Sequence, residues 1–193
     1  IGSFYLVRWA GVNPANGKPL YLDIDGNITD VFSEDDRVIL DKTRDPKYTG
    51  GFGTNVDYKN FFLTSLFTFA GDQWRNNGSY GVLEAAGNGI LAFSNGSKSL
   101  LRAWQEPGDV TDIPALEFNS TRLQLDDRLL EDASFLRLRN VTLGYKLDGK
   151  GSKLFKSMKI YLQGQNLLTF SKWRGFDPES NLAGTFFEFP TPR

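Results

Sequence analysis

Two carboxylate residues near the C-terminal end of the sequence have the spacing of a candidate acid–base pair. Asp177 and Glu179 are two positions apart in a proline-containing segment, and paired carboxylates are the groups that glycosidases use. Such a pair must face across a sugar in a cleft, about 5 to 9.5 Å apart, and no such cleft is evident from the sequence. The chain has no His and no Cys, so the common serine, cysteine and zinc hydrolase mechanisms lack their base or their ligands. We therefore expect no enzymatic activity.

A second acidic group surrounds a glycine in the manner of a calcium-binding loop. Asp23 and Asp25 precede Gly26, and carboxylates clustered at a glycine turn suit a hard cation. If Gly26 is aligned with the glycine of a calcium loop, however, Tyr21 occupies the first ligand position and Phe32 the bidentate one. We expect a solvated acidic loop and no cofactor, with calcium bound by Asp23 and Asp25 as the alternative.

Four aromatic residues lie in or beside long polar segments, where flat rings can stack on sugars. They are Trp74, Tyr80, Trp104 and Trp173. Structural roles compete with ligand binding for three of them. Trp74 and Trp173 end strand-like segments and suit an interfacial aromatic belt, whereas Trp104 follows Leu100 at a helical spacing and suits packing of a short helix. Tyr80 has no such competing role, so it is the freest candidate for substrate contact.

Polar residues in the C-terminal third form two further candidate groups for substrate binding. Arg137 and Arg139 share one face of a strand and suit anionic groups, but we favour ion pairing, because an unpaired buried charge is costly. The expected partners are Asp126, Asp127, Glu131 and Asp132. Gln163 and Gln165 offer neutral donors and acceptors on one strand face. Asn166 joins them only if the strand bulges.

The overall composition indicates a β-rich protein. Aromatic residues make up 14% of the chain, with 16 Phe and 20 Gly, which is typical of strands and turns. Lys and Arg number 22 against 23 Asp and Glu, so no net field attracts nucleic acid. The sequence contains no run of about 18 apolar residues, so it predicts no transmembrane helix. Transmembrane barrel strands instead alternate, and each gives only a weak signal of about ten residues.

Alternation of apolar and polar residues predicts five strands, at about 3–9, 52–58, 61–70, 134–146 and 158–170. One face of each is apolar and the other polar, as in a sandwich or a barrel wall. In a barrel, the apolar faces would contact lipid through Phe61, Phe67, Phe69, Ile160, Leu162 and Phe170. In the fourth strand the parity of the apolar residues changes, which predicts either a bulge near Asn140 or departure of the strand from the bilayer at that point.

The links between these strands alternate between short and long. Lys59-Asn60 and 147–157 are short, whereas 13–47 and 74–131 are long, and outer-membrane barrels likewise alternate short periplasmic turns with long extracellular loops. The first, third and fifth strands therefore run outward. Because barrels have an even number of strands, from about eight upward, we expect a large N-terminal portion and a closing strand beyond these residues.

Several motifs occur together in a fixed order. They are GVNPANG (11–17), WQEPGDVTDIP (104–114), LEDASFLRLRNVTLGY (130–145), IYLQGQNLLTF (160–170), GFDPE (175–179) and FPTPR (189–193). This set resembles the C-terminal part of SusC/RagA TonB-dependent transporters, over essentially the whole chain.

The resemblance implies an all-β fold in which residues 1–193 form the C-terminal portion of a TonB-dependent receptor β-barrel. This portion would be an antiparallel transmembrane segment of about five strands with long extracellular loops, without the plug domain, the TonB-contacting segment or the closing strand. The resemblance also implies a bacterial outer-membrane location, membrane lipid around the barrel, a SusD-like surface lipoprotein as partner, and TonB-driven import of glycans or, in some members, peptides. A soluble β-sandwich carbohydrate-binding module is the alternative.

Overall fold

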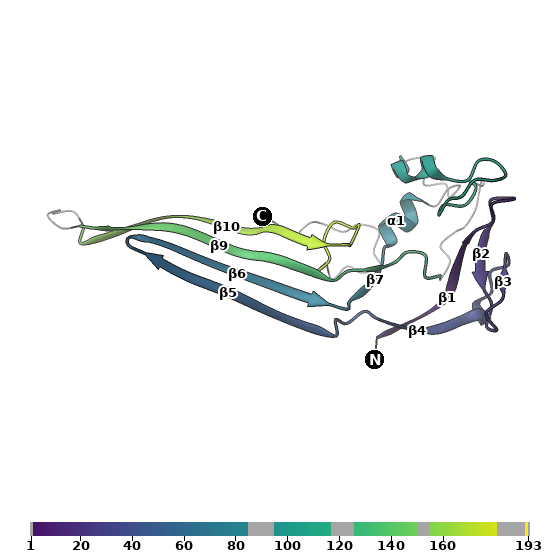
Figure 1. Ribbon diagram of the computed structural model, residues 1–193, viewed down its shortest axis with the longest axis horizontal. Helices are drawn as coiled ribbons and strands as arrows, with labels where there is room; N and C mark the ends of the chain where they lie inside the picture. Colours follow the sequence, from purple (N-terminus) through teal and green to yellow (C-terminus); the bar gives the residue numbers. More distant parts are fainter. Residues whose placement is uncertain (1, 85–94, 117–125, 150–154, 181–191, 193) are drawn as a thin grey trace.

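The computed structural model describes residues 2–84, 95–116, 126–149, 155–180 and 192. The described chain consists mainly of antiparallel strands (Figure 1). The strands are β1 (Ser3–Val12), β2 (Pro19–Leu22), β3 (Ile28–Thr29), β4 (Arg37–Thr43), β5 (Tyr48–Tyr58), β6 (Phe61–Gly71), β7 (Trp74–Asn76), β8 (Leu130–Asp132), β9 (Phe135–Asp148) and β10 (Ser157–Ser171). The short helices are η1 (Glu34–Asp36), α1 (Gly78–Leu83) and η3 (Lys98–Arg102).

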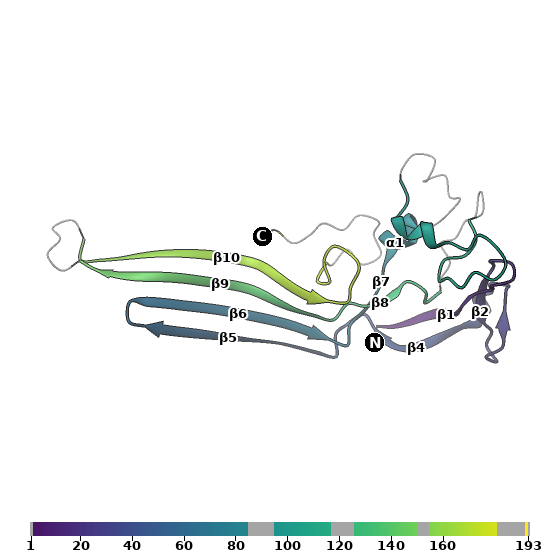
Figure 2. The same cartoon turned by 45° about the horizontal axis from the view of Figure 1, so that its top comes forward.

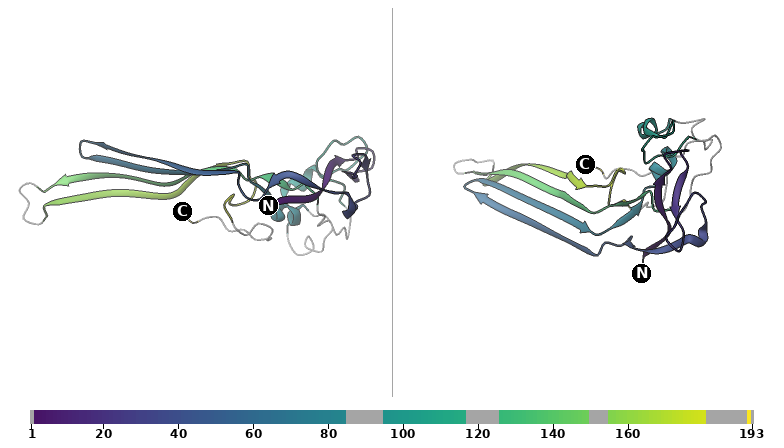
Figure 3. Two further views of the ribbon diagram at one scale, coloured as in Figure 1. Left: turned by 90° about the horizontal axis from the view of Figure 1, so that it is seen from below. Right: turned by 45° about the vertical axis from the view of Figure 1, so that its right-hand side comes forward.

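The four longest strands form one antiparallel sheet in the order β10-β9-β6-β5. β5 and β6 are joined by the expected tight turn at Lys59-Asn60, where Lys59 has φ of 54°. Asn60 Nδ2 donates to the Tyr145 hydroxyl at 3.2 Å and so ties this turn to β9. Seen from below, the sheet is a single thin layer (Figure 3, left). Among the described residues, no second layer covers either face along most of its length.

The register of the sheet places the apolar residues of all four strands on one face. Phe61 is opposite Tyr145, which is opposite Ile160, and Phe69 is opposite Leu136 in the same way. The residues on this face include Phe52, Val56, Phe61, Leu63, Phe67, Phe69, Leu136, Leu138, Val141, Leu143, Tyr145, Ile160, Leu162, Leu168 and Phe170. The expected apolar residues of the third and fifth strands thus share a face. The opposite face includes Asn55, Thr64, Thr68, Arg137, Thr142, Gln163 and Gln165.

The predicted bulge near Asn140 is confirmed. Asn140 lies opposite Leu66 and Leu138 opposite Phe67, so Arg139 is an extra residue in β9. This insertion puts Leu136 and Leu138 on the same face as Leu143, which explains the change of parity. β10 bulges at the same level, where Asn166 has φ of 49°.

Phe62 lies on the polar face, and its ring covers the backbone of Gly144. A Cβ atom built on Gly144 would lie 2.2 Å from Phe62 Cζ. The ring therefore fills the space that the glycine leaves open, which is how aromatic residues compensate for glycines in designed sheets. This contact accounts for an aromatic residue on an otherwise polar face.

A second sheet has the order β3-β2-β1-β4 and lies beyond one end of the long sheet (Figures 1 and 2). Tyr5 pairs with Ile39 of β4, and Trp9 pairs with Tyr21 of β2. We expected the first strand to be followed by a loop up to residue 47, but this segment contains β2, β3 and β4. The first strand therefore belongs to an outer sheet and not to the long one.

The segment between β6 and β9 also folds into defined elements at this end of the long sheet. β7 pairs with β8, with Trp74 opposite Asp132, and α1 follows directly (Figure 2). The elements beyond this end of the long sheet, namely β1–β4, β7, β8 and the short helices, are here called the outer elements. The buried apolar residues gather in them and at their junction with the long sheet; they include Leu6, Val7, Tyr21, Ala103, Ile113, Leu130, Ala133, Phe135 and Trp173. Among the described residues, no helix combines the length and the apolar character needed to cross a bilayer.

Candidate functional site

A buried charge cluster holds the chain after β10 against the polar face of the long sheet. Arg137 of β9 has 2% of its surface exposed, and its guanidinium lies 2.5 Å from Asp177 and 2.8 Å from Glu179. Asp177 also accepts a hydrogen bond from the Glu179 backbone at 2.9 Å. These contacts show that the 175–179 segment folds back over β9, with both carboxylates turned toward the sheet.

Arg139 extends this cluster along the strand. Its guanidinium lies 2.6 Å from Glu179 and donates to Asn166 Oδ1 at 3.2 Å. Asn166 in turn donates from Nδ2 to the Pro192 carbonyl at 3.0 Å. The bulge in β10 thus brings Asn166 into contact with Arg139. The sequence had placed Asn166 on the face of the two glutamines only if the strand bulged, and it had not predicted the contact with Arg139.

The carboxylates that pair with these two arginines are not the ones that the sequence suggested. We expected partners among residues 126–132, but the ion pairs of Arg137 and Arg139 join them to Asp177 and Glu179. The matching spacing could have indicated this pairing, since the two arginines and the two carboxylates are each two positions apart. Glu131 instead forms an ion pair with Arg174 at 2.5 Å.

Trp173 lies in the segment that follows β10 and is buried against it. Its ring lies over Gly175, where a Cβ atom would approach Trp173 Nε1 to 2.2 Å. The indole nitrogen is buried and has no hydrogen-bond partner among the described residues. The ring therefore packs the turn and does not present a stacking surface.

Gln163 and Gln165 of β10 lie on the polar face together, as expected. Gln163 donates from Nε2 to Asn140 Oδ1 at 3.2 Å, and Gln165 is opposite Asn140 in the register. Both side chains are exposed. They form a neutral hydrogen-bonding surface beside the arginine cluster.

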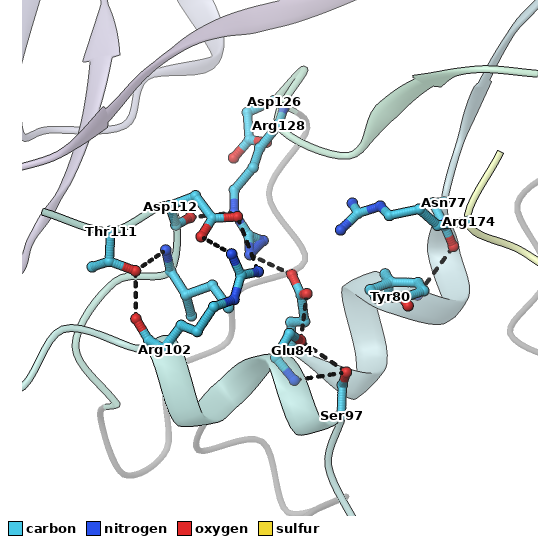
Figure 4. A network of polar contacts seen from close by, with 12 residues as sticks. Asn77, Tyr80, Glu84, Ser97, Arg102, Thr111, Asp112, Asp126, Arg128 and Arg174 are labelled. Atoms are coloured by element: carbon cyan, nitrogen blue, oxygen red, sulfur yellow. Dashed lines mark hydrogen bonds and ion pairs between the residues drawn. The ribbon is translucent and has the colours of Figure 1, made fainter. Parts of the chain in front are cut away.

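Tyr80 lies on α1 and is covered by a cation (Figure 4). The Arg174 guanidinium carbon lies 4.4 Å from the Tyr80 ring centroid, and the same guanidinium is held by Glu131. Asn77 caps the helix by accepting from the Tyr80 backbone at 3.2 Å. One face of the candidate ring is therefore occupied by Arg174.

A polar network joins the outer elements to one another (Figure 4). Glu84 accepts from Arg128 at 2.6 Å and from the Ser99 hydroxyl at 2.7 Å. Arg128 also donates from Nε to the Asp112 carbonyl at 3.3 Å, and Arg102 pairs with the Asp112 carboxylate at 3.1 Å. These contacts fix α1, η3 and the 111–113 segment as one unit.

Trp74 lies where β6 leads into β7, at the boundary between the long sheet and the outer elements. Its Nε1 donates to Asp72 at 3.1 Å, and Lys42 Nζ lies 4.3 Å from its ring centroid. Lys47 pairs with Asp72 at 2.7 Å. Hydrogen bonds from Lys47 and Trp74 hold the pKa of the Asp72 carboxyl below its usual value, and the Asp72 carboxylate raises the pKa of Lys47.

Trp104 follows the helix η3, as its spacing predicted, but it packs on a distant loop. Its Nε1 donates to the Pro14 carbonyl at 3.0 Å, and its ring lies over Gly17, where a Cβ atom would be 2.4 Å from Cε3. Gly17 has φ of 71°, so both its conformation and its contact require glycine. Trp104 thus links the outer loop to the turn after β1.

The Asp23 carboxylate of the acidic loop is bound by the loop itself. Asp23 accepts from the Asn27 backbone at 2.7 Å and from its side chain at 3.0 Å, and the side-chain bond from Asn27 is the main cause of the lowered pKa of Asp23. Asp25 is exposed. Within the described ranges, no group of three or more His, Cys, Asp or Glu residues is arranged to hold a metal.

A single-layer antiparallel sheet with one apolar face and one polar face, and with folded excursions at one end, is the wall of a β-barrel with its loops. No protein-family model matches the sequence. The chain is 32% identical to the TonB-dependent receptor P3 of Formosa agariphila, over 94% of this chain and 19% of the relative. It is 30% identical to the TonB-dependent receptor SusC of Bacteroides thetaiotaomicron, over 92% of this chain and 17% of the relative.

Solved structures give the same result. The RagAB peptide transporter aligns with a TM-score of 0.79 and 36% identity, over 92% of this chain and 20% of the matched chain. The closed-closed state of the RagAB peptide importer aligns with a TM-score of 0.77 and 37% identity. The chain belongs to the SusC/RagA family of TonB-dependent receptors. It spans about a fifth of the length of the relatives that it matches.

Proposed function

We propose that residues 1–193 form the C-terminal portion of the barrel wall and the outer loops of a bacterial outer-membrane transporter that imports glycans. The observation that carries this proposal is the two-faced long sheet. Its apolar face continues across four strands, and many of its residues are exposed, among them Leu162 at 78%. Lipid is the solvent that such a face requires, whereas the opposite polar face suits a hydrated lumen.

A glycan substrate fits the chemistry of the polar face. The charges of Arg137 and Arg139 are paired with carboxylates, so the groups that remain for a ligand include the neutral amides of Gln163 and Gln165. Neutral donors and acceptors match sugar hydroxyl groups. Peptide import by the same mechanism is the second candidate, because the RagAB relatives are named as peptide importers.

The same proposal includes two partners. A SusD-like surface lipoprotein covers the outer elements, and the TonB complex supplies energy through a part of the protein other than these residues. The folded outer region supports the first partner, because Glu84, Arg128 and Asp112 hold its segments as one unit. The family relationship supports the second.

The rival proposal is a soluble β-sandwich that binds carbohydrate. In a sandwich a second sheet covers the apolar face of the first. In the described part of the chain, the second sheet instead lies beyond one end of the long sheet (Figure 2). A protein that is folded and monomeric in buffer without detergent would support the sandwich and contradict the barrel.

Growth of a deletion strain and of its complemented strain tests the transport proposal. The gene that encodes this chain is deleted and restored in the host, and growth on single glycans and on peptide mixtures is compared. We expect growth on at least one glycan to require the gene. Growth that requires it only on peptides would support the second candidate instead.

A further inference from the structure

The segment that follows β10 crosses the polar face of the long sheet at the end where the outer elements lie. It comprises residues 172–180 and is here called the strap. Its contacts join β9 of the long sheet to α1, β7 and β8 of the outer elements. The polar face of a barrel wall is turned toward the lumen. The strap therefore lies on the lumen side of the wall.

Two carboxylates in the middle of the strap fasten it to the wall. The Asp177 carboxylate lies 2.5 Å from the Arg137 guanidinium, and both of these side chains are buried. The Glu179 carboxylate lies 2.8 Å from the guanidinium of Arg137 and 2.6 Å from that of Arg139. Contacts between ionised groups are the strong ones. Movement of the strap away from β9 would break these three ion pairs together.

Contacts within the strap give it a defined shape. The Ser180 N–H donates to the Asp177 carbonyl at 3.2 Å, and Pro178 between them has its φ fixed by the proline ring. The Trp173 ring is buried over Gly175. Loops that open and close usually have few buried contacts and exposed hydrogen bonds. The strap has the opposite properties.

The same strap holds the outer elements. The Arg174 guanidinium lies 2.5 Å from the carboxylate of Glu131 in β8 and 4.4 Å from the ring centroid of Tyr80 on α1 (Figure 4). At the other end of the strap, the Ser180 carbonyl accepts from Arg75 of β7. The contacts with the outer elements therefore lie on both sides of the two carboxylates that hold the wall.

We propose that the strap is a fixed brace, which holds α1, β7 and β8 in one position on the barrel wall throughout import. Its contacts with the wall and with the outer elements alternate along residues 174–180. A segment this short cannot swing away from one side and keep its contacts with the other. That the strap stays in place during import rests on the proposed transport function, whereas the bracing itself does not.

Hydrogen exchange of α1 tests the brace in the intact protein in detergent. The N–H groups of Gly81 and Glu84 donate within α1, so their exchange reports local opening of this helix. We expect Glu179→Gln and Arg174→Gln to speed that exchange about three- to tenfold, as loss of one charged contact should. Glu179→Gln is the decisive variant, because its ion pairs lie on β9 and not on α1.

Two controls separate the brace from general destabilisation. The amides of β5 should exchange at an unchanged rate in both variants, since β5 pairs with β6 and has no contact with the strap among the described residues. Arg102→Gln should leave α1 unchanged, because it breaks an exposed ion pair with Asp112 outside the strap. Unchanged exchange of α1 in Glu179→Gln would overturn the brace.

Cross-linking tests whether the strap stays in place during import. The side chains of Arg139 and Glu179 meet between wall and strap, so a short bismaleimide can join Arg139→Cys to Glu179→Cys, with any cysteine outside residues 1–193 replaced by serine. We expect cells with the joined protein to take up the glycan or peptide that requires the gene as fast as cells with the unjoined double variant. Uptake lost only on joining would show that the strap moves, and would overturn the fixed position.

The two experiments fail independently of each other. If no glycan or peptide requires the gene, the transport proposal fails, and hydrogen exchange still decides whether the strap braces α1. If uptake occurs and Glu179→Gln leaves the exchange of α1 unchanged, the brace is wrong while the transport proposal stands.

Discussion

Arg137 and Asp177 form an ion pair with 2.5 Å between the guanidinium and the carboxylate, and both side chains are buried. The two residues are 40 positions apart. Their contact joins the segment that follows β10 to β9. The part of the chain between the two residues includes the whole of β10. The fold at this level of the sheet therefore depends on a charge pair as well as on strand pairing.

Removal of one charge from this pair should destabilise the protein strongly. In Asp177→Asn, Arg137 loses one of the two carboxylates that pair with it among the described residues, and breaking a buried pair costs about 3–5 kcal/mol. We expect a loss of about 3 kcal/mol in urea unfolding of the intact membrane protein. Asp112→Asn is the control, because its ion pair with Arg102 is exposed and such pairs contribute about 0–1 kcal/mol. Equal effects of the two substitutions would contradict a special role for Arg137.

Gly144→Ala should destabilise the long sheet through Phe62. The new methyl group would overlap the Phe62 ring, which lies 2.2 Å from the Cβ position, and overpacking costs about 1–3 kcal/mol. The double variant Gly144→Ala/Phe62→Ala should recover part of that loss, since the ring is absent. Thermal unfolding of the single and double variants measures the coupling, and strictly additive effects would show that the contact is unimportant.

Charged replacements should separate the two faces of β6. Phe67 lies on the apolar face and Thr64 on the polar face. Arginine on the lipid side of a barrel costs about 2–4 kcal/mol near the bilayer midplane and less near the interfaces. We expect Phe67→Arg to reduce the amount of heat-modifiable, membrane-assembled protein, and Thr64→Arg to leave it near normal. Normal assembly of Phe67→Arg would show that the face is assigned wrongly.

The contact between Asp72 and Lys47 should make the sheet junction sensitive to pH. The folded-state pKa of Asp72 is lowered from 3.8, mainly by the hydrogen bond from Lys47. Its stabilising effect is therefore present above pH 3.8 and is lost as the pH falls through the lower folded value. The pKa of Lys47 is raised from 10.5, so its contribution is present below that pH and is lost as the pH rises through the higher folded value.

A fluorotryptophan at position 74 reports on this junction, because Trp74 Nε1 donates to Asp72. We expect its fluorine NMR shift to change at low pH, below 3.8, and at high pH, above 10.5. Asp72→Asn should remove the acid transition. An acid transition of the same midpoint in Asp72→Asn would assign it to another group.

The long sheet could be predicted from the sequence because its pattern is local. Alternation with period two gives each face, and the change of parity near Asn140 gives the bulge. The same reasoning anticipated that a bulge would bring Asn166 to the face of the glutamines. Here the local pattern and the tertiary structure require the same arrangement.

The outer region and the charge cluster could not be predicted in this way. The pairing of Arg137 with Asp177 and the packing of Trp104 on Gly17 join residues that are far apart in sequence, and periodicity carries no information about such contacts. Leu6 and Val7 are adjacent and both buried, so β1 lacks the clean alternation that would show which sheet it joins.

Spin labels along β10 test the central claim most directly. Residues 1–193 contain no cysteine, so labels at Leu162→Cys and Gln163→Cys can be compared in liposomes that contain the intact protein, with any cysteine outside these residues replaced by serine. We expect the label at 162 to collide with oxygen dissolved in the lipid, and the label at 163 to collide with a water-soluble nickel chelate. Equal access of the nickel chelate to both labels would contradict the assignment of these strands to a barrel wall in lipid.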